Sequence, residues 1–404
     1  MYRPVAYLLI AFLFNGCAGP SPGPTPQWKI GFWQWAEAPA DDTVNTEFDS
    51  LYLQSAWYEA PKAKEYWLVY RSERSSLPTA ETFRDLLRGL PEHRQHMRRR
   101  GLKLAGIQID LDCPTGRLID YAEQLKEVRK LLLPGEELSI TALLDWFRSG
   151  TAIDRVVAAV DEFVPQFYDV DERQSYYYGT RIAVPIDAAK WGPVFNRFQK
   201  RYRIGISTFG RASSKGKFYG DLKPLDIGIL PGYQLKAERT SAQELKLQYN
   251  GPKDRVEFIL STPESIRLAY QAAKKMGQYC GGVLFFRWPT DYEVMTPKAQ
   301  EVLAAVNGVA LPVRTSLKVR QGNCALTHCV DLFITATPPL NAQAINYRVQ
   351  ASNALEYFLP NEKLPVKHPS PTMIEFTLPP YAGRGSIHLG RAVAAKKTSY
   401  TLEQ

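Results

Sequence analysis

Short apolar runs and longer amphipathic stretches alternate along most of this chain. Strand side chains have a period of two and helix side chains a period of 3.6, so the alternation predicts strands and helices in turn. Strands are expected at residues 27–35, 49–55, 66–70, 104–112, 138–143, 163–168, 204–208 and 282–286. Helices are expected from about residue 79 onward, and at 118–133, 153–160, 188–202 and 265–276.

This order of elements is typical of a closed (β/α)8 barrel. Strand then helix recurs about eight times over roughly 280 residues, which matches the usual size of that fold. A doubly wound open sheet is the alternative, but no Gly-rich phosphate turn follows the first strand, which disfavours it.

Two segments interrupt the repeat. Residues 169–187 form a polar loop, and residues 209–262 form a long stretch with strand-like pieces near 227–230, 244–249 and 256–260. We interpret the second segment as a β-rich insertion after strand 7, because long excursions in compact domains are usually functional. Only strand patterns follow residue 311, so we expect a barrel at 27–310 and a small β-sandwich at 311–404. The sandwich either supports the barrel or binds a polymer.

The fourth predicted strand ends in two carboxylates. Its apolar positions are Ile107, Ile109 and Leu111, and its polar positions are Gln108, Asp110 and Asp112. Barrel enzymes place their active sites at the carboxyl ends of the strands, and carboxylates are costly to bury without a partner or a purpose. We therefore expect both aspartates to face an active site. The alternative is that they cap the following helix.

The first 26 residues have the pattern of an export signal and a linker. A positive charge at Arg3 precedes an apolar run at 5–14, and residues 18–26 are rich in Pro, Gly and Ser. The apolar run is too short to span a bilayer as a mature helix. The small residue before Cys17 resembles a bacterial lipobox, which implies a signal peptide at 1–17 and lipidation of Cys17. No acidic residue follows Cys17 closely, and by resemblance to Gram-negative lipoproteins this implies an outer-membrane location, facing the periplasm or the cell surface.

The remaining cysteines fit an exported protein. Cys324 and Cys329 flank a short polar loop in the β-rich region, and we predict a disulfide between them. Cys113 follows one barrel strand and Cys280 precedes another, so these two lie at opposite ends of a barrel and should not pair.

Charge and histidine content exclude some classes of function. The net charge is +9, from 50 basic and 41 acidic residues, and the densest basic run, 94–100, is interpreted as a solvated helix face. No continuous basic stripe with stacking aromatics occurs, so we expect no nucleic-acid partner. An anionic envelope or polysaccharide remains compatible with the charge. None of the five histidines falls at a predicted barrel-strand end, so we expect neither a metal site nor a cofactor.

Three motifs carry a family resemblance. The run 106–114 resembles the fourth-strand motif Gly-x-Asp-x-Asp-x-Glu of chitinase-like glycosidases (glycoside hydrolase family 18), with Gln108 and Asp112 replacing its first Asp and its Glu. Residues 165–169 resemble that family's sixth-strand motif, and residues 281–286 resemble its last-strand motif. The chain is closer still to a bacterial lipoprotein family of unknown function, domain of unknown function 3142, to which no activity is attached.

The glycosidase resemblance implies roles for three residues. Asp112 corresponds to the general acid, Asp110 to the carboxylate that orients the substrate's N-acetyl group, and Tyr168 to a hydrogen-bond donor to that group. Breaking a glycosidic bond requires such an acid and a stabilised oxocarbenium-like state. Two carboxylates this close repel, so one pKa is expected to rise. Asp112 is one methylene shorter than Glu, so the alternatives are an inactive site and a site that uses a different partner, such as Asp145 or Asp169.

Aromatic and polar residues near the predicted strand ends indicate a glycan cleft, because aromatic faces stack on sugar rings. The predicted substrate-binding residues are Gln108, Gln166, Asp145, Trp146, Trp33, Trp35, Phe286, Arg287 and Tyr177. The expected function is therefore a lipid-anchored, glycoside hydrolase-like protein with a polysaccharide or oligosaccharide as its partner. A glycan-binding barrel without activity and an envelope scaffold are the alternatives. The sequence leaves the oligomeric state open.

Overall fold

The computed structural model describes most of the chain. The described residues are 26–37, 48–72, 77–168, 186–214, 217–218, 227, 232–239, 245–290, 293, 295–309, 314–324, 328–337, 344–361, 364–378 and 386–404. Every helix among them is too short or too polar to cross a bilayer.

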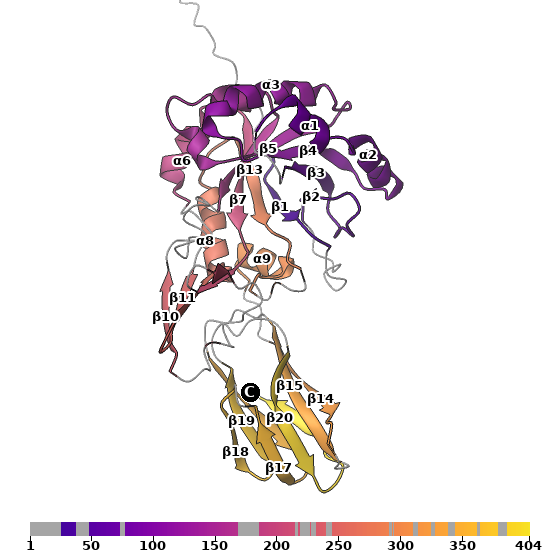
Figure 1. Ribbon diagram of the computed structural model, residues 1–404, viewed down its shortest axis with the longest axis vertical. Helices are drawn as coiled ribbons and strands as arrows, with labels where there is room; N and C mark the ends of the chain where they lie inside the picture. The colour runs from indigo at the N-terminus through magenta and orange to yellow at the C-terminus, as the bar shows by residue number, and fades with distance from the viewer. Residues whose placement is uncertain are drawn as a thin grey trace, which may run out of the picture.

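Eight parallel strands close into a barrel (Figure 1), which confirms the predicted fold class. The strands are β1 (Lys29–Gln34), β2 (Ser50–Leu53), β3 (Glu65–Arg71), β4 (Leu104–Asp110), β5 (Glu137–Ala142), β6 (Glu162–Phe167), β7 (Arg201–Ser207) and β13 (Cys280–Phe286). They pair in the order β1-β13-β7-β6-β5-β4-β3-β2. The predicted alternation holds on β4, because Ile107, Ile109 and Leu111 all pack in the core that includes the surrounding helices.

The predicted helices form with different ends, and α9 is a helix that was not predicted. The helices are α1 (Ala80–Leu86), α2 (Leu90–Arg99), α3 (Leu118–Arg129), α4 (Ile153–Ala158), α6 (Ala188–Asn196), α8 (Pro263–Ala273) and α9 (Ala299–Val306), with short 3-10 turns η2 (Thr115–Arg117) and η3 (Leu144–Phe147). Thr79 caps α1 through a hydrogen bond from the amide of Thr82, and Thr262 and Ser265 form a capping box on α8. Residues 54–64 connect β2 to β3 without a helix.

The insertion after β7 is rich in strands, as predicted, and forms an antiparallel sheet. Its strands are β8 (Arg211–Ser214), β9 (Lys217–Phe218), β10 (Gln234–Arg239), β11 (Leu245–Asn250) and β12 (Arg255–Leu260), in the order β10-β11-β12-β8-β9. Of the strand-like piece expected near 227–230, only Ile227 is described, and it is not in a strand. Alternate residues of β11, Leu245, Leu247 and Tyr249, pack with β12 in a separate small core. The side chains on one face of this sheet therefore form a small hydrophobic core that is separate from the core of the barrel.

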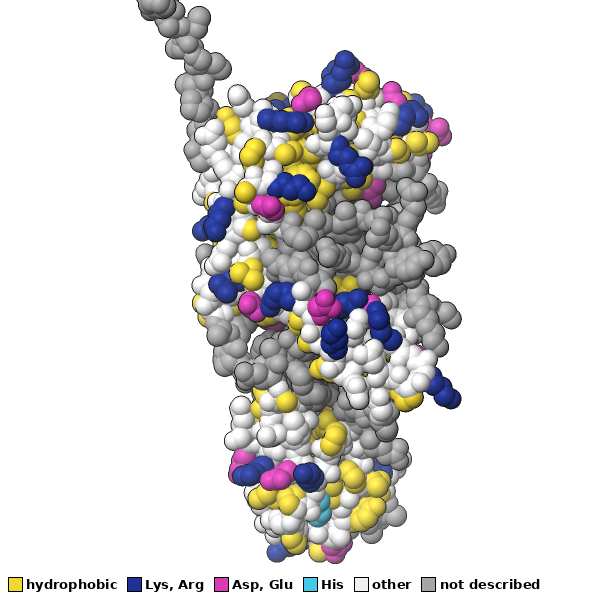
Figure 2. Space-filling model, turned by 90° about the vertical axis from the view of Figure 1, so that its left-hand side faces the viewer, with side chains coloured by type: hydrophobic (Ala, Val, Ile, Leu, Met, Phe, Trp, Pro, Cys, Tyr) yellow, Lys and Arg dark blue, Asp and Glu magenta, His cyan; other side chains and the backbone are white. Residues whose placement is uncertain are grey.

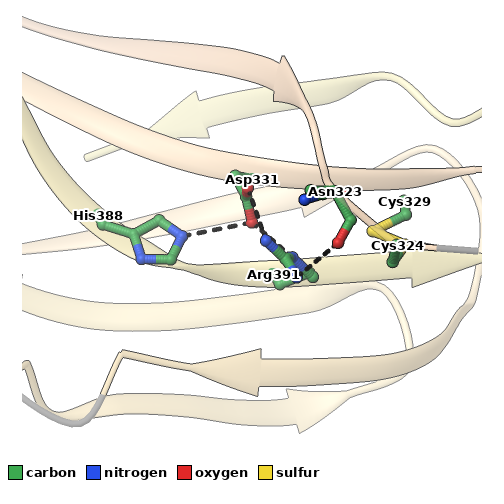
Figure 3. The surroundings of a disulfide bond; sticks show 6 residues. All are labelled: Asn323, Cys324, Cys329, Asp331, His388 and Arg391. Atoms are coloured by element: carbon green, nitrogen blue, oxygen red, sulfur yellow. Dashed lines mark hydrogen bonds and ion pairs between the residues drawn. A yellow bond between two sulfur atoms is a disulfide. The ribbon is translucent and has the colours of Figure 1, made fainter.

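The C-terminal part is a sandwich of two four-stranded sheets. The strands are β14 (Arg314–Gln321), β15 (Cys329–Thr337), β16 (Ile345–Ala351), β17 (Leu355–Pro360), β18 (Val366–Ser370), β19 (Met373–Leu378), β20 (Ser386–Ala394) and β21 (Tyr400–Glu403). Figure 1 shows the sandwich beyond the end of the barrel that also carries the insertion. The structure joins Cys324 to Cys329 by a disulfide beside the Asp331–Arg391 ion pair (Figure 3), whereas Cys113 and Cys280 are free and buried.

A buried ionic network fills the amino-terminal end of the barrel interior. Arg203 and Glu162 are 1% and 0% exposed, and the Nε of Arg203 lies 2.9 Å from Oε2 of Glu162. Nη1 of Arg203 donates to Ser50, and the hydroxyl of Tyr52 donates to Glu162, each over 2.8 Å. Glu65 lies 3.4 Å from Arg203 and 2.6 Å from Lys29. Both buried carboxylates are thus compensated by cations, as burial of charge requires.

Candidate functional site

Asp110 occupies the last position of β4 and is bound on both sides by neighbouring strands. Its carboxylate is 6% exposed. The Thr141 hydroxyl on β5 donates to Oδ1 of Asp110 over 2.6 Å, and Nη1 of Arg71 lies 3.7 Å from Oδ2. Arg71 is the direct cross-strand neighbour of Asp110 on β3. Asp110 therefore does not point into water from the rim as the sequence suggested. Its carboxylate lies within the carboxyl-terminal end of the barrel, between the guanidinium of Arg71 and the hydroxyl of Thr141.

Burial raises the pKa of the Asp110 carboxyl above its usual value, although the charge of Arg71 and the hydrogen bond from Thr141 act in the opposite direction. A carboxyl with a raised folded-state pKa contributes stability below the unfolded-state pKa and loses that contribution as the pH rises through the folded-state pKa. Ionisation of Asp110 near neutral pH therefore opposes folding.

Replacement of Asp110 by Asn should consequently raise the midpoint of thermal unfolding at pH 7. The difference from the wild type should vanish below about pH 4, where the carboxyl is protonated in both folded and unfolded chains. Thermal unfolding followed by circular dichroism across this pH range measures the effect, with Asp154→Asn on the exposed side of α4 as the control. A lower midpoint for Asp110→Asn at pH 7 would show that the ion pair with Arg71 outweighs burial.

Asp112 lies beyond the strand and is exposed. The predicted strand at 104–112 is two residues too long, because β4 ends at Asp110 and Pro114 follows closely. The two carboxylates are thus in different environments, one buried and one in contact with solvent. Different environments shift the pKa values of two neighbouring carboxyl groups apart, so that one can act as an acid and the other as a charged group.

Three of the predicted substrate-binding residues are fully buried. Trp33 Nε1 donates to Oε1 of Gln108 over 2.7 Å, and Nε2 of Gln108 donates to Ser139 over 3.0 Å. Trp33 and Gln108 are both 0% exposed, so they form a layer of the barrel core. Trp146 is also fully buried, and donates to the carbonyl of Cys113 over 2.9 Å. The predicted substrate contacts of these three residues are wrong, because none presents a surface to a ligand.

Four other predicted residues gather around the strand ends of β6, β13 and β1. Nε2 of Gln166 donates to the hydroxyl of Tyr168 over 3.1 Å, and the Tyr168 ring stacks on Phe286 with centroids 5.0 Å apart. Phe286 meets the edge of Trp35 at 5.2 Å. The guanidinium of Arg71 lies 6.0 Å from the Trp35 ring, which connects this row of rings to Asp110.

Of the remaining predicted residues, Arg287 lies beside this row, with its guanidinium 5.7 Å from the centroid of the Phe286 ring. Arg287 forms an ion pair with Glu293, and Asp145 accepts a hydrogen bond from Thr115 over 2.7 Å. Asp169, Tyr177 and Cys17 lie outside the described residues. No group of His, Cys, Asp and Glu that could hold a metal ion occurs in the described ranges.

The site also contains Thr141, which was not predicted, and Arg71, whose position near a predicted strand end indicated a cation that could hold carboxylates or hydroxyls. Thr141 holds Asp110 from β5, and Arg71 holds it from β3. A signal for Thr141 is present in the sequence, because Ser139 and Thr141 are the polar alternate positions of an otherwise apolar strand. The pairing of Arg71 with Asp110 follows only from the register of β3 on β4.

Several solved structures resemble this fold at low sequence identity. The spore cortex-lytic enzyme SleL of Bacillus cereus has a TM-score of 0.47 at 14% identity, covering 72% of this chain and 76% of its own. Chitinase ChiW of Paenibacillus sp. str. FPU-7 has 0.45 at 13%, covering 93% and 54%. The group IV chitinase of Ostrinia furnacalis, in complex with allosamidin, has 0.44 at 10%, covering 70% and 98%. A search of curated proteins finds no match to this chain.

A family model described as "Domain of unknown function (DUF3142)" matches residues 78–291. The match begins just before α1 and ends shortly after β13, so it includes β4, β6 and β13, the strands that carry Asp110, Gln166 and Phe286. It covers just over half of the 404-residue chain. The chain therefore belongs to the DUF3142 family, as its sequence indicated.

Proposed function

We propose that this protein is an exported, lipid-anchored, glycoside hydrolase-like barrel that acts on an envelope or extracellular polysaccharide. The observation that carries the proposal is the pairing of buried Asp110 with exposed Asp112 at the carboxyl end of β4. The row of Tyr168, Phe286 and Trp35 beside them supplies apolar ring faces for sugars. The lipobox-like Gly16-Cys17 supports an outer-membrane lipoprotein of a Gram-negative cell, facing the periplasm or the surface.

In the proposed mechanism Asp112 protonates the glycosidic oxygen as the bond to the anomeric carbon breaks. Asp112 is exposed to solvent and Asp110 is 6% exposed, so the proposal assigns the two carboxyl groups different roles. Asp110, held by Thr141 and Arg71, orients the polar group of the sugar that stabilises the developing positive charge. On an N-acetylated sugar this group is the acetamide, whose carbonyl oxygen attacks the anomeric carbon, and the Tyr168 hydroxyl donates to it. Water then opens the cyclic intermediate.

The Asp112→Asn variant tests this assignment directly. Loss of a general acid typically lowers the rate by 10²–10⁴-fold, so turnover of a cleaved glycan should fall by at least about 100-fold, while binding persists. Hydrolysis of a panel of N-acetylated and acidic polysaccharides, measured as reducing ends, gives the rates. Asp154→Asn, which also removes an exposed carboxylate, is the matched control. Unchanged turnover in Asp112→Asn would eliminate this role.

A barrel that binds a glycan without cleaving it is the second candidate. It is favoured by the neutral Gln108 sealed beneath the site, where the resembled glycosidases have a carboxylate, and by the short side chain of Asp112. A displacement of about 1 Å at the reacting atoms can lower a rate by about 100-fold. Tight glycan binding by the wild-type chain, with no reducing ends released, would support this candidate over hydrolysis.

A further inference from the structure

One end of the barrel collects the carboxyl ends of its helices. In a (β/α)8 barrel each helix runs back to the amino-terminal end of the next strand. α2 precedes β4, α3 precedes β5, α6 precedes β7 and α8 precedes β13, so all four helices finish at the same end. Each finishes in basic residues, which stabilise the negative end of a helix dipole. These residues are Arg98–Arg100, Arg129–Lys130, Arg197 with Lys200, and Lys274–Lys275.

The acids at this end are already neutralised by bases of their own. Glu136 pairs with Arg94, Asp161 with Arg129, Glu127 with Lys130, and Glu137 with Arg201. At this end of the barrel, six cations have no ion pair with any described residue. We call them the basic end, and they are Arg98, Arg99, Lys103, Lys200, Lys274 and Lys275. This surface therefore has a net positive charge, because its basic residues outnumber the acidic residues that could pair with them.

Two leucines protrude from the same end. Leu131 and Leu133 are 50% and 44% exposed in the turn between α3 and β5, next to Pro134 and Gly135. Figure 2 shows Lys and Arg side chains, hydrophobic side chains and some Asp and Glu side chains around the upper end of the molecule. Exposed leucines among cations without ion pairs fit a binding partner that has an apolar interior and an anionic boundary. The leucines would be buried in the interior while the boundary attracts the cations, so both interactions favour binding.

The chain also enters the barrel at this end. Pro26 precedes β1, and its Cβ lies 3.3 Å from the place that a Cβ on Gly281, at the start of β13, would occupy. Cys17 is nine residues earlier in the sequence. Nine extended residues span at most roughly 30 Å. A lipid on Cys17 would therefore hold the basic end within reach of the membrane that contains it.

We propose that the basic end docks on the anionic headgroups of the membrane, with Leu131 and Leu133 inserted at the boundary. This inference rests on the proposed envelope location and not on the glycan chemistry. It fixes the orientation of the molecule. The insertion and the β-sandwich lie toward the opposite end of the barrel (Figure 1). Asp110 is the last residue of β4 and is therefore also at that end, so the site faces away from the bilayer.

Vesicle flotation of the full chain tests the inference. Cys17→Ser is included in every variant, so that no acyl chain contributes to binding. The probes are vesicles of phosphatidylcholine alone and of phosphatidylcholine with about one third phosphatidylglycerol. The parent chain should bind the anionic vesicles at least about tenfold more tightly than the neutral ones, and added NaCl should reduce the difference. The variant Arg98→Gln/Arg99→Gln/Lys103→Gln/Lys275→Gln should lose about 100-fold or more of this affinity, at about fivefold per cation.

A matched variant distinguishes the effect of removing cations from the basic end from the effect of lowering the net charge of the protein. Lys318→Gln/Lys367→Gln/Lys396→Gln/Lys397→Gln removes four exposed lysines from the sandwich and lowers the net charge equally. It should keep at least about half of the parent's binding. Equal losses in the two variants, no preference for anionic vesicles, or a soluble polyanion such as dextran sulfate bound as tightly as vesicles would each overturn the inference. Glycan turnover and mass spectrometry of Cys17 in the unmodified chain report separately on the proposed function.

Discussion

Replacement of Arg203 by methionine is expected to lower the free energy of unfolding of the barrel by about 3–5 kcal/mol, the usual effect of removing one partner from a buried ion pair. Methionine fills a similar volume, so the loss comes from charge. Glu162 would remain 0% exposed, with Arg201 at 3.1 Å as its remaining cation. Urea unfolding followed by tryptophan fluorescence measures the effect, since Trp33 and Trp67 lie inside the barrel.

The control for this prediction removes both charges. Arg203→Met/Glu162→Gln should recover part of the stability lost in the single variant, because no uncompensated carboxylate is left in the core. A double variant that is less stable than Arg203→Met would contradict this account and would indicate that packing of the guanidinium, and not its charge, stabilises the barrel.

The same network should make the barrel sensitive to acid. Burial alone raises the pKa of Glu65, but hydrogen bonds from Lys29 and Ser50 and the charge of Arg203 outweigh burial and lower the pKa to about 2. The pKa of Glu162 is also lowered, because Arg203 and Arg201 outweigh its burial. Carboxylates with lowered folded-state pKa values stabilise the fold above the unfolded-state pKa, near 4.3, and lose this contribution as the pH falls. Arg203→Met should therefore flatten the decrease in stability below about pH 4.

Gly282→Ala is expected to destabilise the barrel by about 3 kcal/mol or more, through combined backbone strain and overpacking. Gly282 has φ +141°, which non-glycine residues rarely adopt. A Cβ there would also lie 1.9 Å from the carbonyl oxygen of Lys29, its cross-strand partner on β1. The obstacle is backbone, so no side-chain movement relieves it. The unfolding midpoint and the yield of soluble protein measure the effect.

Gly116→Ala is the matched glycine control. Nothing lies within 4 Å of the position that its Cβ would occupy. Its unfolding midpoint should stay close to that of the wild type. If Gly282→Ala were equally well tolerated, the junction between β1 and β13 would have to be looser than its register indicates, and the Gly-Gly pair at 281–282 would not be required for barrel closure.

In the sandwich, strand patterns predicted strands near 313–319, 330–337, 344–351, 373–378 and 386–393, and missed three strands that lie at sheet edges. The strands β17, β18 and β21 were not predicted, and each is an edge strand of the sandwich. β17 ends at Pro360 and β18 contains Pro369. Proline is tolerated on edge strands because one side of the strand makes no ladder hydrogen bonds. A proline in a short segment argues against a strand when only the sequence is known. The sequence of that segment does not show whether the strand would lie at the edge or in the centre of a sheet.

The candidate site was predictable only in part. Asp110 was found from period-two alternation on a single strand, and the rings of Trp35 and Phe286 from their positions at strand ends. Tyr168 was found from the family resemblance. Trp33 was misplaced because an aromatic residue near a strand end has the same local pattern whether it lines a cleft or a core. Its full burial depends on Gln108, 75 residues away, which accepts its hydrogen bond.

The sequence by itself determined the barrel, the insertion, the sandwich and the strand that carries the carboxylates, because each depends on side-chain periodicity within a short segment. Only the tertiary structure decided which carboxylate is buried and which cations compensate the buried acids. Arg71 meets Asp110 through the register of β3 on β4, and Arg203 meets Glu162 across the barrel interior. Ionic and hydrogen-bonded partners are set by distance in space, and residues far apart in the chain carry no local mark of the partner that folding brings to them.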